Sequence, residues 1–167
     1  DQLIKSGDVV VELGAAPGGW TELIANWTGP SGRVFALDVL TMDSVADVEF
    51  ILGDFTEEVA LDRLMQSLNG IRVDVVLSDM APNLSGNKSV DQPRAMYLCE
   101  LALDFARQTL NPGGAFFVKV FQGEGFDEFF QALRTDFSVL KTRKPVASRS
   151  RSRETYLLAM GFRGSTL

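Results

Sequence analysis

The sequence predicts an α/β fold in which a mostly parallel sheet of seven strands has helices on both faces and an antiparallel last strand. Short runs rich in β-branched and aromatic residues alternate along the chain with longer segments of helical spacing, as in a parallel sheet. The chain then closes with two strand-like runs that have no long helix between them. The last strand can therefore insert antiparallel to its neighbours.

Length and composition limit the class of protein. The chain has 167 residues, of which 46% are hydrophobic and 23% charged, and this predicts a single globular domain over residues 1–167. No apolar run approaches the ~20 residues needed to cross a bilayer, so we expect no membrane partner. The first strand follows Asp1 almost at once and there is no initiator methionine, so we expect that an N-terminal portion precedes this chain.

The counts of reactive side chains exclude several chemistries. The sequence has no histidine, which excludes a histidine base, a Ser-His-Asp triad and the usual histidine-containing zinc sites, and we expect no bound metal. The single cysteine, Cys99, lies in an apolar helical pattern that favours a buried thiol, and it suits a reducing, cytoplasmic location. Proton chemistry therefore falls to Lys, Asp, Glu or Tyr side chains.

The stretch from Asp8 to Trp20 is the centre of the predicted fold. A valine-rich strand over residues 8–13 leads into the turn Gly14-Ala-Ala-Pro-Gly-Gly19, and a helical pattern follows over residues 18–27. Glycines let a backbone turn tightly and approach a bound small molecule, and sheets of this kind hold ligands at the carboxyl ends of their strands. Gly14, Gly18 and Gly19 are therefore candidate cofactor-binding residues.

The remaining elements follow from the same periodicities. Further strands are predicted at 33–38, 48–54, 73–79 and 115–121, with a closing pair at 137–142 and 154–160. Helices are predicted at 57–68, 91–110 and 126–133. Thr56 and Asp91 are the expected start residues of the first two of these helices. The polar loop at 84–90 is the best candidate for a mobile substrate lip.

Three of the predicted parallel strands end in an acid, at Asp38, Asp54 and Asp79. Because the carboxyl ends of parallel strands meet at one edge of a sheet, we expect these carboxylates near the glycine turn. Asp38 can accept hydrogen bonds from both hydroxyls of a ribose. Asp54 either accepts from an adenine amino group or is an ordinary acid of a surface turn.

The glycine turn favours S-adenosyl-L-methionine over NAD as the cofactor. A dinucleotide-binding turn prefers Gly-x-Gly-x-x-Gly, whereas Ala16 occupies the position of the second glycine, where a pyrophosphate needs the backbone close. S-adenosylmethionine has no phosphate and tolerates such a loop. Asp38 does not separate the two cofactors, because both carry a ribose.

Lys119 lies in a strand of apolar residues, where a lysine loses hydration unless it is paired or reaches the sheet edge. Asp79 ends the neighbouring strand, and an antiparallel last strand would begin at Glu154, on the edge where its parallel neighbours end. We expect Asp79, Lys119 and Glu154 to converge in a functional cluster. A snorkelling lysine or a structural ion pair is the alternative.

A basic stretch precedes Glu154 in a chain whose net charge is −6. Its six cations are Lys141, Arg143, Lys144, Arg149, Arg151 and Arg153. Such a stretch is often only a solvated face, but this one leads directly into the predicted cluster. We therefore expect it to bind a nucleic acid through the phosphates, so that the polyanion enters the site.

Several long motifs, in order and over almost the whole chain, closely resemble the FtsJ (RrmJ-type) ribosomal RNA 2′-O-ribose methyltransferases. These motifs are Leu13-Gly-Ala-Ala-Pro-Gly-Gly-Trp20, Ser78-Asp-Met-Ala-Pro-Asn83, Asp91-Gln-Pro-Arg-Ala-Met-Tyr-Leu98, Val118-Lys-Val-Phe-Gln-Gly-Glu-Gly-Phe-Asp127 and Ser150-Arg-Ser-Arg-Glu-Thr-Tyr156. The resemblance implies a Rossmann-like S-adenosylmethionine-dependent methyltransferase fold. It also implies that a monomer methylates a uridine of large-subunit ribosomal RNA, presented within the large ribosomal subunit.

The resemblance further implies roles for individual residues. The implied S-adenosylmethionine contacts are Gly18, Trp20, Asp38, Asp54 and Asp79. Asp79, Lys119 and Glu154 are implied members of a Lys-Asp-Lys-Glu tetrad whose first lysine is absent here, since Lys5 stands too close to the first strand to match it. The alternatives are a transfer RNA or mRNA-cap methyltransferase of the same family, an NAD-dependent oxidoreductase, and an RNA-binding module without catalysis.

Overall fold

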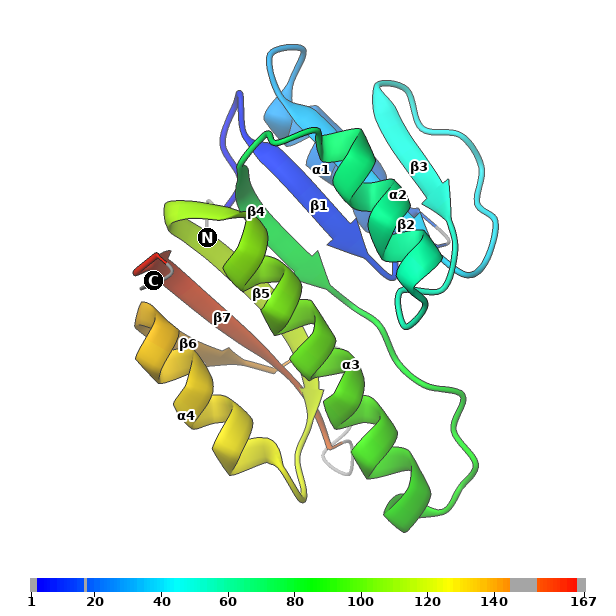
Figure 1. The fold of residues 1–167 in the computed structure, drawn as a ribbon, viewed down its shortest axis with the longest axis vertical. Helices are drawn as coiled ribbons and strands as arrows, with labels where there is room; N and C mark the ends of the chain where they lie inside the picture. The colour runs from blue at the N-terminus through cyan, green and yellow to red at the C-terminus, as the bar shows by residue number, and fades with distance from the viewer. Residues whose placement is uncertain (1–2, 17, 145–152, 165–167) are drawn as a thin grey trace.

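The computed structural model describes residues 3–16, 18–144 and 153–164 and confirms the predicted α/β fold (Figure 1). Its sheet of seven strands has the order β3-β2-β1-β4-β5-β7-β6. The strands are β1 (Val9–Leu13), β2 (Arg33–Asp38), β3 (Val48–Leu52), β4 (Val73–Ser78), β5 (Leu110–Phe121), β6 (Phe137–Arg143) and β7 (Glu154–Phe162). The helices are α1 (Gly19–Thr28), α2 (Glu58–Leu68), α3 (Lys88–Thr109) and α4 (Phe126–Asp136).

The direction of the strands places the candidate site. Strands β3, β2, β1, β4 and β5 pair in parallel, whereas β7 is antiparallel to both β5 and β6, as the sequence predicts. The strand order reverses between β1 and β4, and ligands of open α/β sheets bind at such a point, beyond the carboxyl ends. The glycine turn follows β1 and Asp79 follows β4. Both therefore stand at the place where this topology holds a ligand.

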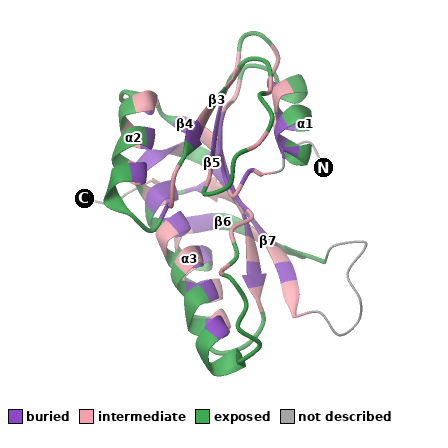
Figure 2. Ribbon diagram, turned by 90° about the vertical axis from the view of Figure 1, so that its right-hand side faces the viewer, coloured by how far each residue is buried: buried purple, intermediate pink, exposed green. Residues whose placement is uncertain are grey.

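Helices cover the two faces of the sheet unequally. Helices α2, α3 and α4 lie on one face and α1 on the other, with the sheet between them (Figures 1 and 2). The larger core packs under the three helices and includes Phe35, Phe116 and Phe137. A smaller core around Val10 and Ile24 lies on the α1 face. Burial of these apolar side chains stabilises the packing of the helices on the sheet. The face that carries only α1 is covered less than the face that carries three helices.

Two predicted helix starts are wrong. Helix α2 begins at Glu58 after Glu57, and the Thr56 hydroxyl donates a hydrogen bond of 2.7 Å to Asp54 instead of capping the helix. Helix α3 begins at Lys88, because the Asn87 side chain accepts a hydrogen bond from the Ser89 N–H and caps it. In both cases a polar side chain forms a hydrogen bond with a residue close to it in the chain. The helix therefore begins at a different residue from the one that the pattern predicts.

Asp91 lies inside the first turn of α3 and is buried. Its carboxylate accepts hydrogen bonds from the Ser85 N–H at 2.9 Å and from the Gly86 N–H at 3.1 Å. The backbone N–H of Ser85 is the main reason why the pKa of Asp91 lies below its ordinary value. Asp91 thus ties the loop at 84–90 to α3.

Strand β5 starts earlier than predicted, at Leu110 instead of Ala115. The pairing with β4 is irregular here: Val73 pairs with Leu110, and regular pairing resumes where Val75 meets Ala115. The segment Asn111–Gly114 therefore ends α3, as predicted, but bulges within the strand instead of preceding it.

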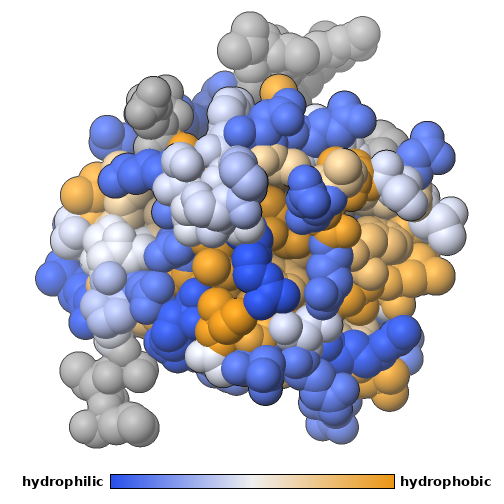
Figure 3. Space-filling view, turned by 90° about the horizontal axis from the view of Figure 1, so that it is seen from above, coloured by the Kyte–Doolittle hydropathy of each residue, from blue (hydrophilic) through white to orange (hydrophobic). Residues whose placement is uncertain are grey.

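No helix within the described ranges is long and apolar enough to cross a membrane. On the face seen from above in Figure 3, hydrophobic residues reach the surface between hydrophilic ones. Helix α1 carries two of the larger exposed apolar side chains, Leu23 and Trp27.

Candidate functional site

The glycine turn is locked to the backbone that follows β4. The N–H groups of Gly14 and Ala15 donate to the Leu37 carbonyl at 2.8 and 3.1 Å, and the Asp79 N–H donates to the Leu13 carbonyl at 2.9 Å. Gly14 has a φ of +80°, and a Cβ added there would lie 2.9 Å from the carbonyl carbon of Asp79. Gly14 therefore lets the turn and Asp79 lie in direct contact.

The second half of the turn opens into α1. The Gly18 N–H donates to the Ala15 carbonyl at 2.9 Å, and a φ of +106° at Gly18 turns the chain into the helix. A Cβ added at Gly19 meets no atom within 4 Å, so this residue borders open space. Trp20 stacks on Phe117 of β5 with ring centroids 6.1 Å apart, which connects α1 to the strand that carries Lys119.

Asp38 is the last residue of β2, whereas Asp54 lies beyond β3, which ends at Leu52 and not at Asp54 as predicted. Asp38 braces the turn, because its carboxylate accepts from the Ala16 N–H at 2.9 Å and from the Leu40 N–H at 3.0 Å. Asp54 accepts from both the N–H and the hydroxyl of Thr56, as an acid of a surface turn does. An ionised carboxylate has about four acceptor sites, so both acids retain capacity for a ligand.

Lys119 and Asp79 meet, as the sequence predicts. The Lys119 ammonium nitrogen lies 3.2 Å from Asp79 Oδ1, and the lysine side chain is only 12% exposed. The Tyr156 hydroxyl donates to the same Asp79 oxygen at 3.2 Å. Tyr156 stands opposite Lys119 in the pairing of β5 with β7. One carboxylate oxygen therefore joins side chains from two further strands.

Tyr156 also connects this group to Glu154. Burial raises the pKa of the Tyr156 hydroxyl, and the charges of Asp79 and Glu154 and the hydrogen bonds to these carboxylates raise it further. Glu154 and Tyr156 stand two residues apart in β7, so they face the same side of the sheet. Tyr156 is not among the predicted site residues, although its spacing from Glu154 is a signal that could have indicated it.

Half of the predicted RNA-binding residues lie together on β6 or just after it. Lys141, Arg143 and Lys144 are exposed, and Arg143 pairs with Tyr156 across the strands, so a cation continues the row formed by Lys119 and Tyr156. Arg153 instead donates to the Gln92 side chain at 3.2 Å and to the Gln122 carbonyl at 3.1 Å. Arg149 and Arg151 lie outside the described residues.

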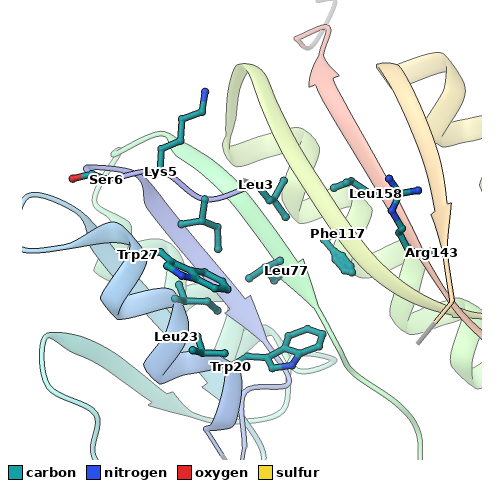
Figure 4. A pocket seen from close by; sticks show the side chains of 12 residues that line it. Leu3, Lys5, Ser6, Trp20, Leu23, Trp27, Leu77, Phe117, Arg143 and Leu158 are labelled. Atoms are coloured by element: carbon teal, nitrogen blue, oxygen red, sulfur yellow. The ribbon is translucent and has the colours of Figure 1, made fainter. Parts of the chain in front are cut away.

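A hollow of about 650 Å³ lies on the α1 face (Figure 4). It is lined mostly by apolar side chains, from Leu3 and Ile4 through α1 to Leu77, Phe117 and Leu158. Trp20 and Phe117 border it, and both rings also contact Tyr156. The apolar hollow and the charged cluster therefore meet at these aromatic rings.

Glu12 is a further acid that the sequence predictions do not include. It belongs to β1 and is only 2% exposed. The Thr21 hydroxyl from α1 donates to it at 2.5 Å. Burial raises the pKa of Glu12 from 4.5 to about 7, and the nearby charges of Asp79 and Asp38 add to the increase. Its position within a strand of apolar residues is the sequence signal that could have indicated it.

Replacement of Gly14 by alanine should destabilise the protein more than the same change at Gly70. Both glycines have a positive φ, near +80°, but a Cβ at Gly70 meets no atom within 4 Å. Gly70→Ala should cost about 1–2 kcal/mol from backbone strain alone. Gly14→Ala should cost about 1–3 kcal/mol more, because the Cβ overlaps the backbone of Asp79. Urea unfolding measures both, and equal losses would contradict this packing.

Replacement of Glu12 by glutamine should remove a pH dependence of stability. The folded protein retains a proton on Glu12 up to about pH 7, whereas the unfolded chain releases it near 4.5. Stability should therefore fall as pH rises between these values and stay level above them. Urea unfolding at about pH 5 and about pH 8 should show the wild type losing up to about 3 kcal/mol relative to Glu12→Gln. If the free energy of unfolding changed with pH in the same way in the wild type and in Glu12→Gln, the raised pKa of Glu12 would be contradicted.

Comparison with known proteins agrees with the motifs. Residues 1–162 match the model of the family described as FtsJ-like methyltransferase. A relative from Chromohalobacter salexigens, named ribosomal RNA large subunit methyltransferase E, is 58% identical over 164 residues, which are 98% of this chain and 78% of the relative.

Solved structures show the same fold. A ribosomal RNA methyltransferase from Plasmodium falciparum has 27% identity and a TM-score of 0.83, with 96% of this chain and 90% of that chain covered. Fibrillarin from Aeropyrum pernix, with natively bound S-adenosyl-L-methionine, has 17% identity and a TM-score of 0.61, with 96% and 69% covered, and shows the fold alone. The matched motifs, the family model and the 58% identical relative together establish that this chain belongs to the FtsJ-like methyltransferase family.

Proposed function

We propose that this chain transfers a methyl group from S-adenosyl-L-methionine to a ribose 2′-hydroxyl of ribosomal RNA, at a uridine of the large subunit. The observation that carries the proposal is the ion pair between Lys119 and Asp79, which lies directly beside the glycine turn. An amine at this place can act on a hydroxyl, whereas a site for cofactor binding alone has no need of it. The family and the name of the 58% identical relative support ribosomal RNA as the substrate.

The side chains at the carboxyl edge fit S-adenosylmethionine. Asp38 retains acceptor capacity for ribose hydroxyls, and Asp54 stands one strand further along for an adenine amino group. Carboxylates on neighbouring strands also suit a cofactor that carries positive charge. When bound, S-adenosylmethionine supplies a methyl group that its positively charged sulfur already activates, so the protein chiefly positions the nucleophile.

Each member of the cluster has a distinct task in this proposal. Asp79 holds the Lys119 amine in place, and Lys119 either accepts the proton of the 2′-hydroxyl or stays charged and orients that hydroxyl. Tyr156 is a protonated donor near neutral pH, its raised pKa keeps it so at higher pH, and it holds Asp79 and Glu154 in place. The reaction therefore depends on alignment more than on a strong base.

The cations of β6 give a path for the RNA. Lys141 and Lys144 are exposed at the end of the sheet where the row of Lys119 and Tyr156 lies, so a phosphate held there would bring a neighbouring ribose towards Lys119. The 2′-hydroxyl distinguishes RNA from DNA, so this enzyme should ignore deoxy substrates.

Transfer of tritiated methyl groups tests the function. Large ribosomal subunits that lack the modification should accept label at one ribose, and naked ribosomal RNA should accept less. Calorimetry on the same protein should show binding of S-adenosylmethionine but not of NAD. Label in transfer RNA or capped RNA instead would contradict the ribosomal substrate, and binding of NAD alone would contradict methyl transfer.

Two substitutions at Lys119 should separate its two roles. Lys119→Met should lower the transfer rate by about 10²-fold or more, because it removes the amine that contacts the hydroxyl. Lys119→Arg retains a charge that does not titrate near neutral pH. A near-normal rate in Lys119→Arg, with an unchanged pH profile, would contradict the base role. Arg134→Met, at an exposed position of α4, is the control and should retain the wild-type rate.

Loss of the β6 cations should weaken RNA binding without affecting the cofactor. In the double variant Lys141→Gln/Lys144→Gln, the logarithm of the RNA affinity should fall less steeply with the logarithm of the salt concentration. Each lost phosphate contact should reduce the size of this slope by about 0.7–0.9. Arg134→Gln, on the exposed side of α4, is the matched control. Filter binding at several salt concentrations measures the slopes. Equal slopes in all three proteins would contradict an RNA path along β6.

A further inference from the structure

Glu12 is a buried acid for which the proposed mechanism has no use. It lies in β1, 2% exposed, one residue before the strand ends at the glycine turn. The Thr21 hydroxyl, from the first turn of α1, donates to its carboxyl group. A carboxylate is costly to bury without a cation, so this position needs a reason beyond packing.

The charged groups around Glu12 are mainly acids. Thr21 from α1 contributes a hydrogen bond but no charge, β2 contributes Asp38, and the end of β4 contributes Asp79. Lys119 of β5 and Tyr156 of β7 reach this region through Asp79, to which both are bonded. Burial and these two aspartates hold the pKa of Glu12 near 7. A protonated Glu12 thus avoids a third negative charge beside the turn.

The proposed reaction changes the charge at this place. S-adenosylmethionine carries a positively charged sulfur, and its product, S-adenosylhomocysteine, is a neutral thioether. A cation bound near Asp38 and Asp79 opposes their field at Glu12 and favours the ionised form of its carboxyl group. The thioether lacks that charge and favours the protonated form.

We propose that Glu12 is a positioning residue that matches the charge of the site to that of the cofactor, and this inference rests on the proposed function. Glu12 releases a proton when S-adenosylmethionine binds and regains one once the neutral product is formed. In the transfer itself a bond forms from the methyl carbon to the ribose oxygen and the bond to sulfur breaks. The sulfur retains that electron pair, and the hydroxyl proton is released.

One consequence is a cofactor preference that depends on pH. By linkage, a proton released with one ligand makes the affinity for that ligand rise with pH. The protein should therefore prefer S-adenosylmethionine over S-adenosylhomocysteine more strongly above pH 7 than below it. Both ligands carry the same amino group, so protons that this group binds or releases do not contribute to the difference between the ligands.

Calorimetry in two buffers of different ionisation enthalpy measures the released protons directly. Because the pKa of Glu12 is about 7, about half of the Glu12 carboxyl groups carry a proton at that pH. S-adenosylmethionine should therefore release up to about half a proton more than S-adenosylhomocysteine. Glu12→Gln should release equal numbers with both ligands, and its affinity ratio should not change with pH.

Two further variants sharpen this test. Thr21→Val removes the hydrogen bond that lowers the pKa of Glu12, so the pH at which the affinity ratio changes should move upwards. It also tests the inference if Glu12→Gln fails to fold. Glu49→Gln, at an exposed position of β3, is the control for loss of a carboxylate and should match the wild type.

The outcomes separate this inference from the proposed function. Equal proton release with both ligands in the wild type, or a wild-type difference retained in Glu12→Gln, would overturn the role of Glu12 while leaving the methyltransferase proposal intact. No binding of S-adenosylmethionine by the wild type would instead contradict the proposed function and overturn this inference with it.

Discussion

The site depends first on the close packing of Gly14 against the backbone of Asp79. This contact joins the turn after β1 to the chain after β4, at the place where the strand order reverses. Since Asp79 also accepts the bonds from Lys119 and Tyr156, the same contact fixes the distance between the cofactor turn and the amine. A side chain at Gly14 would separate the two halves of the site. Precise alignment of a nucleophile needs such a rigid connection.

The balance of acidic and basic groups is the second feature on which the site depends. Acids lie at or just beyond the ends of several neighbouring strands, and Lys119, whose side chain is only 12% exposed, offsets the charge of Asp79. Burial and the remaining negative field raise the pKa of Glu12, and this field leaves the turn suited to a cationic ligand. A cofactor whose charge disappears on reaction suits such a site, because the field that helps to bind it no longer favours the product. In the proposed function RNA, a polyanion, would contact the exposed cations on β6 instead.

Sequence patterns predicted some local features well and others poorly. The acid Asp38 at the end of β2, the glycine turn and the antiparallel final strand are confirmed, because periodicity and topology determine them. The predicted starts of α2 and α3 were wrong. The Thr56 hydroxyl donates a hydrogen bond to Asp54, and the Asn87 side chain accepts one from the Ser89 N–H. Partner choice among polar groups depends on distances that a linear pattern does not contain.

By itself the sequence determined the order of elements, the α/β class, the family and the convergence of Lys119 with Asp79. These follow from side-chain periodicity and from the rule that parallel strands end at one edge. Only the tertiary structure placed Tyr156 between Asp79 and Glu154 and surrounded Glu12 with acids. The physical reason is that a pKa and a bridging hydrogen bond depend on burial and on neighbours distant in the chain. Such neighbours exist only once the strands have paired.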